Sequence, residues 1–443
     1  MIINSLKMNE KNPGSHHPQD DFLKRVATIV LAGGQGTRLY PLTAARSKPA
    51  VGFGGHYRLI DVPLSNSLNS RINQIFVISQ YFASELHQHI LSTYQLDIFR
   101  SGGLELLTPQ ETTKGKAWFK GTADAVRQTQ DYIMRCSAEW FMILSGDQLY
   151  NMDLLEMLNF AKEQDADLTI ASIPICEKEA TRMGLLEINE ECRITDFFEK
   201  PSDPEVLKRF QLSSNFLKKN GKSTEDPQYL ASMGIYIFKR SALVDILKME
   251  GDDFGRDLIP EFIKKGKSSA YIYRGYWEDI GTVSSYYEAN LMLTKGEGLN
   301  TYEEENQIYS APQHIPSALI NGTRVTDSLI SHGGVIEADE ISHSVIGIRA
   351  LIKKGTVIRD SIIMGNQTYH PFLNQVLPED QYFSIGENCQ IEKAIIDEEA
   401  RIGNNVQLIN KDNLTTYDGD GIYIRDGIII VTSGTEIPDG FVL

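Results

Sequence analysis

The sequence predicts an α/β protein in two parts, in which a mostly parallel sheet with helices on both faces precedes a parallel β-helix. Between about residues 25 and 295, short apolar runs such as Val26–Ala32 alternate with amphipathic stretches. This alternation is typical of parallel strands buried on both faces. Beyond residue 316, aliphatic residues recur every six positions. A six-residue period fits neither a helix nor an alternating strand, and it indicates hexapeptide turns of a β-helix.

The strands and helices of the first part follow from its apolar runs. Strands are expected at Val26–Ala32, Ile75–Ser79, Phe141–Ser145 and Leu168–Ile173, and helices at Ala123–Met134 and Leu154–Gln164. Ligands of such sheets bind beyond the carboxyl ends of the strands. Polar residues that directly follow a strand are therefore the first candidates for a site.

The six-residue repeat of the second part is carried by aliphatic residues, with small or branched residues four positions after one of them. The aliphatic positions are Ile346, Ile352, Ile358 and Met364, then Ile396, Ile402 and Leu408; the small or branched ones are Ala350, Thr356 and Ala400. The repeat slips near Ile341 and breaks between residues 367 and 382, where an insertion is expected. A β-sandwich is the alternative. Residues 294–316 are polar and contain two prolines, which predicts a linker.

Composition limits the possible functions. A chain of 443 residues with a formal net charge of −16 predicts two or three domains and disfavours binding to nucleic acid or to an acidic membrane. No run of eighteen apolar residues is present, so no membrane span is expected. Four widely spaced cysteines fit a reducing cytoplasm. Residues 1–21 look like a flexible tail and not like a signal or transit peptide.

A glycine-rich turn, LAGGQGTRL, directly follows the first expected strand. The backbone N–H groups of such a turn can approach phosphate oxygens closely, and Arg38 adds a cation. The turn is neither a Walker loop nor a dinucleotide fingerprint. Lys48, with Arg46 beside it, is a second cation that can fold over the same phosphates. A solvated basic surface is the alternative explanation.

Two carboxylates lie where metal ligands would be expected. Asp147 ends the strand at Phe141–Ser145, and Asp279 follows Trp277 in an expected short loop. Mg²⁺ prefers one or two carboxylates together with phosphate oxygens. Either aspartate alone would more often be a turn residue.

These motifs resemble the sugar nucleotidyltransferases, and the rest of the first part resembles the glucose-1-phosphate adenylyltransferases in particular. The matching segments run in the family's order, and the hexapeptide part fits as well. They are Gly33–Leu39, Lys48–Pro49, Gly54–Asp61, Leu64–Asn66, Trp118–Val126, Ser145–Asp147, Phe198–Pro201, Ala231–Tyr236, Asp253–Asp257 and Trp277–Gly281.

The resemblance implies a Rossmann-like catalytic domain over residues 22–297, a linker over 298–316 and a left-handed β-helix over 317–443 that serves regulation and oligomerisation. It implies a cytoplasmic homotetramer that converts ATP and α-D-glucose 1-phosphate to ADP-glucose and diphosphate with Mg²⁺. The product would supply glycogen synthesis. Neither a nucleic acid nor a membrane partner is expected.

The resemblance also implies roles for individual residues. Arg38, Lys48 and Asp147 would be catalytic, and Asp147 and Asp279 would hold the metal. The nucleotide would be bound by Gly33, Gly34, Gly36, Thr37, Gln110, Gly121 and Thr122. Glucose 1-phosphate would be bound by Phe119, Gly184, Glu199, Lys200, Ser232, Tyr236 and Trp277. Bacterial members carry Tyr where this chain has Phe119. By themselves, Tyr236 and Trp277 could equally be core aromatics.

Anionic allosteric effectors are usual in this family, yet the positions of its activator lysines carry Ala45, Glu398 and Ser433 here. We therefore expect weak or altered activation by 3-phosphoglycerate and fructose 1,6-bisphosphate. Two alternatives to the enzyme stay open: a nucleotidyltransferase with another base, and a catalytically silent regulatory subunit. Silent subunits commonly lack the phosphate-binding cations, whereas Arg38, Lys48 and Lys200 are present.

Overall fold

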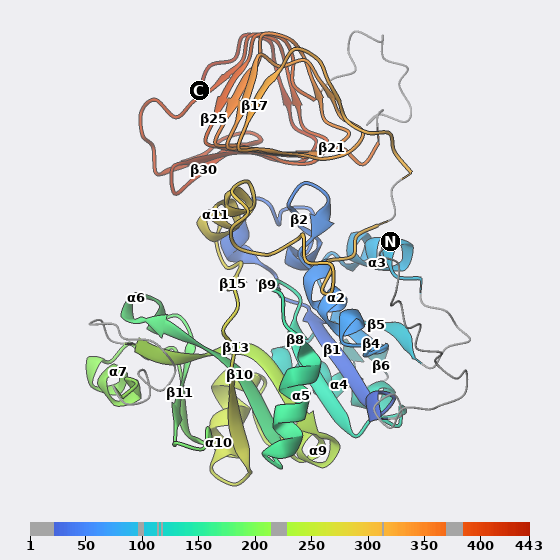
Figure 1. Ribbon diagram of the computed structural model, residues 1–443, viewed down its shortest axis with the longest axis vertical. Coiled ribbons are helices and arrows are strands. Elements are labelled where there is room, and N and C mark those ends of the chain that lie inside the picture. The colour runs from blue at the N-terminus through green and yellow to red at the C-terminus, as the bar shows by residue number, and fades with distance from the viewer. Residues whose placement is uncertain are drawn as a thin grey trace, which may run out of the picture.

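The computed structural model describes residues 22–95, 102–112, 115–116, 118–213, 228–311, 314–368 and 384–443. The expected tail and most of the expected insertion lie outside these residues. The chain forms an α/β part below and a β-helix above it in Figure 1. The α/β fold followed by a parallel β-helix is confirmed.

The first part contains β1 (Val26–Ala32), η1 (Thr37–Leu39), η2 (Lys48–Ala50), β2 (Gly52–Phe53), β3 (Tyr57–Arg58), α2 (Asp61–Asn69), β4 (Gln74–Ser79), α3 (Ala83–Thr93), β5 (Gly103–Leu107), β6 (Glu111–Thr112), β7 (Gly115–Lys116), α4 (Thr122–Ile133), β8 (Trp140–Ser145), β9 (Gln148–Tyr150), α5 (Leu154–Glu163), β10 (Leu168–Cys176), α6 (Glu177–Ala180), β11 (Gly184–Ile188), β12 (Ile194–Glu199), α7 (Pro204–Phe210), β13 (Gln228–Lys239), α9 (Arg240–Leu247), η3 (Phe254–Leu258), α10 (Ile259–Ile263), β14 (Ser268–Ile272), β15 (Trp277–Asp279) and α11 (Val283–Leu293).

The main sheet has nine strands, in the order β12-β11-β13-β8-β1-β4-β5, with β10 joining β13 to β14. Strands β8, β1, β4 and β5 are parallel neighbours, as is the pair β10 and β14. The long strand β13 runs antiparallel to β8, β10 and β11. The parallel half follows the sequence prediction, and the antiparallel half is a feature that the apolar runs did not reveal.

Strand β1 shows why the sheet needs helices on both faces. Val26 and Val30 belong to one hydrophobic cluster with α5, whereas Ala27 and Ile29 belong to a second cluster with α4 and α9. Successive side chains of a strand point to opposite faces, so a continuous apolar run is buried only between two helical layers. The carboxyl ends of β1, β4 and β8 consequently meet at one edge of the sheet.

The second part contains β16 (Leu319–Ile320), β17 (Arg324–Thr326), β18 (Leu329–Ile330), β19 (Val335–Ile336), β20 (Glu340–Ser342), β21 (Val345–Ile348), β22 (Leu351–Ile352), β23 (Val357–Arg359), β24 (Ile362–Gly365), β25 (Gln390–Glu392), β26 (Ala394–Ile396), β27 (Arg401–Ile402), β28 (Gln407–Leu408), β29 (Thr416–Asp418), β30 (Ile422–Arg425), β31 (Ile428–Val431) and β32 (Glu436–Ile437).

These short strands form three parallel faces of a β-helix. Ile346, Ile352, Ile358 and Met364 fall on successive strands β21 to β24, so residues six apart occupy neighbouring faces. The same face is revisited after a full coil, as Ile341 pairs with Ile358. The six-residue period is therefore confirmed as a β-helix. At its C-terminal end, β29, β30 and β31 form an antiparallel meander that the period did not predict.

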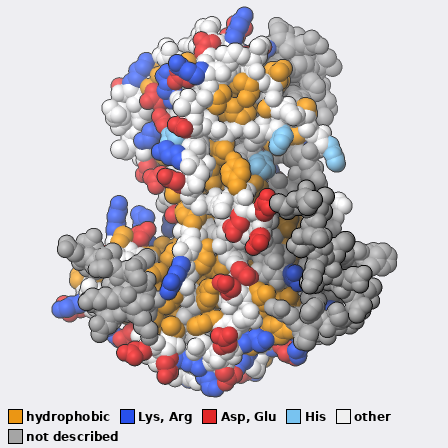
Figure 2. All heavy atoms as spheres, in the orientation of Figure 1, with side chains coloured by type: hydrophobic (Ala, Val, Ile, Leu, Met, Phe, Trp, Pro, Cys, Tyr) orange, Lys and Arg blue, Asp and Glu red, His pale blue; other side chains and the backbone are white. Residues whose placement is uncertain are grey.

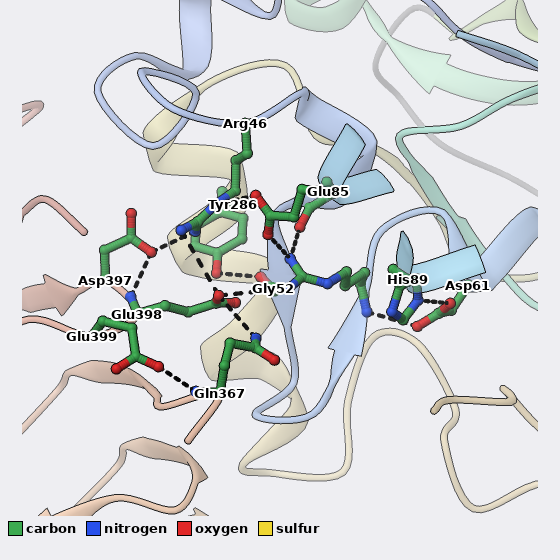
Figure 3. A network of polar contacts seen from close by, with 12 residues as sticks. Arg46, Gly52, Asp61, Glu85, His89, Tyr286, Gln367, Asp397, Glu398 and Glu399 are labelled. Atoms are coloured by element: carbon green, nitrogen blue, oxygen red, sulfur yellow. Dashed lines mark hydrogen bonds and ion pairs between the residues drawn. The ribbon is translucent and has the colours of Figure 1, made fainter. Parts of the chain in front are cut away.

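The β-helix packs on the α/β part through a shared core and polar contacts. Val345 and Ile362 of the β-helix belong to the same hydrophobic cluster as Phe53. The backbone N–H of Ile348 donates to the carbonyl of Gly55 at 3.1 Å. Figure 3 shows a polar network at this interface, centred on Arg46. The expected linker also packs on the α/β part, since Ile308 is buried.

Charged side chains of both signs are interspersed on the face drawn in Figure 2. Its described residues form no broad basic surface of the kind that polyanionic macromolecules need. Within the same described ranges, no helix combines the length and apolar character that crossing a membrane requires.

Candidate active site

The glycine-rich turn after β1 closes against η2. Gly36 has φ 64°, a left-handed conformation, and a Cβ placed there would lie 3.0 Å from the Cβ of Lys48 and 3.1 Å from Thr43. The hydroxyl of Thr43 donates to the carbonyl of Gly36 at 3.0 Å. Glycine at this position therefore lets the turn approach Lys48. Gly34 has no neighbour within 4 Å of its missing side chain, which leaves its backbone open.

A cavity of about 220 Å³ lies at this turn. Its lining includes the predicted residues Gly34, Gly36, Thr37, Arg38, Lys48 and Asp147. Gly33 is adjacent and faces Gln80, which follows β4. Residues from the ends of β1 and β8 thus meet there, as the rule for parallel sheets predicts.

Lys48 joins the two carboxylates that the sequence singled out. Its Nζ lies 2.6 Å from Oδ2 of Asp147 and 3.9 Å from Oδ1 of Asp279. Ser145 also donates a hydrogen bond to Asp147. Asp279 was expected in a loop, and this prediction was wrong. It is the last residue of the short strand β15, where it pairs with Gln148 of β9. This two-stranded ribbon holds Asp279 across from Asp147.

The two carboxyl groups have opposite pKa shifts. Burial raises the pKa of Asp147, but the ammonium of Lys48 outweighs it and the net pKa is lowered. Burial and the charge of Asp147 raise the pKa of Asp279, against the attraction of Lys48, Arg38 and Lys200. Two carboxylates that repel each other around one cation favour further positive charge between them.

Glu199 is the last residue of β12, and Lys200 follows it. Lys200 has φ 50°, and its Nζ lies 3.2 Å from Oε1 of Glu199. Gly184 of β11 pairs with Glu199, and a Cβ on Gly184 would lie 2.6 Å from Oε2 of Glu199. Glycine at 184 therefore makes room for the glutamate side chain.

Ser232 and Tyr236 lie on β13 at an irregularity in its pairing with β10. Tyr236 is buried, and burial raises the pKa of its hydroxyl, with a further contribution from Glu199. Its ring also packs 6.1 Å from that of Phe254. Tyr236 is thus both a core aromatic and a neighbour of Glu199. Trp277 is half-buried, and its Nε1 has no hydrogen-bond partner among the described residues.

Four further residues with expected roles are not among those that line the cavity: Gln110, Gly121 and Thr122, expected at the nucleotide, and Phe119, expected at glucose 1-phosphate. Gln110 is exposed after β5, and its Nε2 donates to the hydroxyl of Tyr132 at 3.1 Å. The backbone N–H of Phe119 donates to Oε1 of Gln80 at 2.5 Å. Gly121 and Thr122 begin α4, where the hydroxyl of Thr122 donates to Asp253.

Two residues beside the site received no role from the sequence. Gln148 follows Asp147, is buried, and its Oε1 has no partner among the described residues. Asp253 lies in a segment that resembles a motif of the family, but the motif did not indicate a role for this residue. Its spacing of more than a hundred residues from Thr122 concealed their contact.

Comparison with known families gives two matches. A family model described as nucleotidyl transferase matches residues 27–296. A model described as the GLGC left-handed parallel β-helix domain matches residues 313–442. The first covers more than half of the chain and contains every residue of the site described above.

Proposed function

The chain belongs to the nucleotidyl transferase family, and we propose that it is a glucose-1-phosphate adenylyltransferase. It would join ATP to α-D-glucose 1-phosphate and release ADP-glucose and diphosphate. The observation that carries this proposal is the contact of Lys48 with Asp147 and Asp279 at the cavity beside the glycine-rich turn. Such a site suits a nucleoside triphosphate and a sugar phosphate. The β-helix of the GLGC type supports the adenylyl-transfer reading.

In the proposed reaction a phosphate oxygen of glucose 1-phosphate attacks the α-phosphorus of ATP, and diphosphate leaves. The attacking group is already an anion, so no side chain has to remove a proton. Catalysis then rests on positioning and on stabilisation of charge. Arg38 and Lys48 would stabilise charge on the transferred and leaving phosphates, while Lys200 orients the attacking phosphate and Glu199 accepts sugar hydroxyls.

The carboxylates fit a magnesium ion. Asp147 and Asp279 both contact one ammonium group, and Asp147 raises the pKa of Asp279. Repulsion of this kind is relieved by a hard cation, which takes one or two carboxylates together with phosphate oxygens. When bound, Mg²⁺ would supply charge neutralisation for the nucleotide phosphates.

The first test is diphosphate release by the purified chain with glucose 1-phosphate and each of ATP, UTP, GTP and dTTP. Release with ATP that requires Mg²⁺ and stops on chelation would support the proposal. Release with another nucleotide would retain the family chemistry and refute the product. The absence of release with every nucleotide would favour a regulatory subunit.

The same proposal includes the protein's setting. The enzyme would be a cytoplasmic homotetramer that supplies the glucosyl donor of glycogen synthesis. Its response to 3-phosphoglycerate and fructose 1,6-bisphosphate would be weak, because Glu398 brings negative charge to the interface where Arg46 lies. Light scattering after size-exclusion chromatography measures the assembly, and a mass other than four chains would refute the tetramer.

A further inference from the structure

The segment from Asp252 to Leu258 forms a braced loop followed by a short π-helix, η3. Asp253 accepts from the backbone N–H of Arg256 at 3.0 Å through Oδ1. Asp257 accepts from the N–H groups of Asp252 and Asp253 at 2.9 and 3.0 Å. π-Helical turns are rare and frequently occur at functional sites. These hydrogen bonds hold the loop in one conformation, so a shift of a residue that contacts one side of it would also move the residues on its other side.

On one side, this loop binds the start of α4. The hydroxyl of Thr122 donates to Oδ2 of Asp253 at 2.9 Å and accepts from the N–H of Phe254 at 3.0 Å. The carbonyl of Asp252 accepts from the N–H groups of Ala123 and Asp124 at 2.9 and 3.1 Å. The loop thus satisfies helix N–H groups that otherwise lack an intrahelical partner.

The N-cap of α4 is Gly121, which has no side chain to serve these N–H groups. A Cβ on Gly121 would lie only 2.3 Å from the carbonyl oxygen of Asp252. The absence of a side chain at Gly121 is therefore required by the loop itself, whatever the nucleotide requires.

On its other side, the loop contacts the expected sugar pocket. A Cβ on Gly255 would lie 3.1 Å from Oε2 of Glu199, so the backbone passes close to that carboxylate. Phe254 is buried, and its ring packs 6.1 Å from Tyr236 and 5.9 Å from Phe238. One short segment consequently touches residues assigned to the nucleotide and residues assigned to the sugar.

We propose that residues 252–258 are a positioning element that sets the geometry of both substrate subsites together. The hydrogen bond from Thr122 to Asp253 connects this element to the nucleotide subsite. Thr122 then acts through Asp253 on Glu199 in addition to any contact of its own with the nucleotide. This inference rests on the proposed function, because it uses the two subsites that the function assigns.

The test compares three variants with the wild type. T122V keeps the shape of the side chain and removes both hydrogen bonds, whereas T122S retains the hydroxyl. T129V is the matched control on the same helix, because the hydroxyl of Thr129 donates to the carbonyl of Ala125 at 2.8 Å, within α4. The KM for ATP and the KM for glucose 1-phosphate are measured for each, together with the thermal unfolding temperature.

We expect T122V to raise both KM values by roughly 2- to 10-fold, the effect of losing one or two net hydrogen bonds. T122S should reverse most of the increase seen in T122V, because its hydroxyl restores those bonds. T129V should change neither KM. If T122V raises only the KM for ATP, or behaves like T129V, the coupling of the subsites is refuted.

A second readout separates this inference from the proposed function. Amide hydrogen exchange of the ligand-free protein requires no activity and no substrate. In T122V, exchange should accelerate in residues 252–258 and in residues 196–199. In T129V, exchange at both segments should stay unchanged. Unchanged exchange at 196–199 in T122V would overturn the inference even if the wild type proves to be an active adenylyltransferase.

Discussion

Two cations that are two residues apart in the sequence serve two different ion clusters. Arg46 lies at the interface with the β-helix, where its guanidinium is 2.6 Å from Asp397 and 3.8 Å from Glu398. Lys48 turns to the cavity and contacts Asp147 and Asp279. The loop before η2 therefore supplies one charge to the domain interface, and the first residue of η2 supplies another to the candidate active site.

The charges of the interface cluster are compensated within the cluster. Arg46 faces Glu85, Asp397 and Glu398 (Figure 3). Arg58 contacts Glu85 and Glu398, and each carboxylate lies within 4 Å of a guanidinium nitrogen. Burial raises the pKa of Asp397, while Arg58 and Arg46 outweigh burial and lower the pKa of Glu398. Carboxylates outnumber the cations, so this cluster has no positive charge left for an anion.

The cluster at the candidate active site has a different balance. Arg38, Lys48 and Lys200 act on Asp279, with Asp147 as the second carboxylate. Arg38 is exposed and borders the cavity. With Glu199, the partner of Lys200, the cluster holds three cations and three carboxylates, so its charges balance, whereas carboxylates are in excess at the interface. The comparison teaches that charge balance and access to a cavity, more than the presence of arginine or lysine, distinguish the candidate binding site from a structural cluster.

The largest effect should come from removing Lys48 from the cluster at the candidate active site. Lys48→Met should lower kcat by ~10²–10³, the effect of losing one charge-stabilising donor. Steady-state kinetics with ATP and glucose 1-phosphate measure it. A loss below tenfold would show that Lys48 does not act on the phosphates.

Removing Arg46 from the interface cluster should lower the stability of the fold. Arg46→Met leaves Asp397 and Glu398 buried with less compensation, and breaking such a pair costs about 3–5 kcal/mol. Arg209→Met is the control, because Arg209 pairs with Asp196 on an exposed surface and such pairs contribute about 0–1 kcal/mol. Denaturant unfolding compares the two. Equal losses would contradict a special role for burial.

A smaller effect should follow from removing the excess negative charge of the interface cluster. Activation of the wild type by 3-phosphoglycerate or fructose 1,6-bisphosphate should stay below about tenfold, because the arginines are already neutralised. Glu398→Gln removes one negative charge from them and should increase the response to either effector by about 3-fold or more.

The neighbouring Glu399 provides the control for that experiment. It contacts the backbone N–H of Gln367 and neither arginine, so Glu399→Gln should respond as the wild type does. An equal increase in both variants, or strong activation of the wild type, would refute the role of Glu398.

The smallest effect concerns Glu278, a carboxylate that forms no salt bridge with any described residue. Burial, followed by repulsion from Glu179 and Asp279, raises the pKa of Glu278 to about 7, against 4.5 ordinarily. The folded state then holds the proton more tightly than the unfolded state, so stability falls as the pH rises from about 4.5 to 7. Glu278→Gln should stabilise the protein at pH 8 by roughly 1 kcal/mol, since water partly screens this half-buried group.

Thermal unfolding from pH 5 to pH 8 measures that effect. The variant and the wild type should converge toward pH 5, where Glu278 is protonated in the folded state. Glu190→Gln, at an exposed position, should leave the profile unchanged. A constant difference between Glu278→Gln and the wild type at all pH values would contradict titration of Glu278.

Much of the fold was predictable because local patterns report burial. The run Val26–Ala32 is a strand at the predicted bounds. The antiparallel half of the sheet was not, since an apolar run does not reveal the direction of its neighbours. Asp279 illustrates the same limit: its expected loop is a strand only because β9 pairs with β15.

The sequence by itself determined the layers of the first part, the six-residue coil of the second and the types of residue near the phosphates. These properties depend on periodicity and on residues close together in the chain. Only the tertiary structure decided that Arg46 and Lys48 face different clusters and that Thr122 bonds to Asp253. Such contacts join residues far apart in the sequence, and their geometry exists only once the packed elements bring them together.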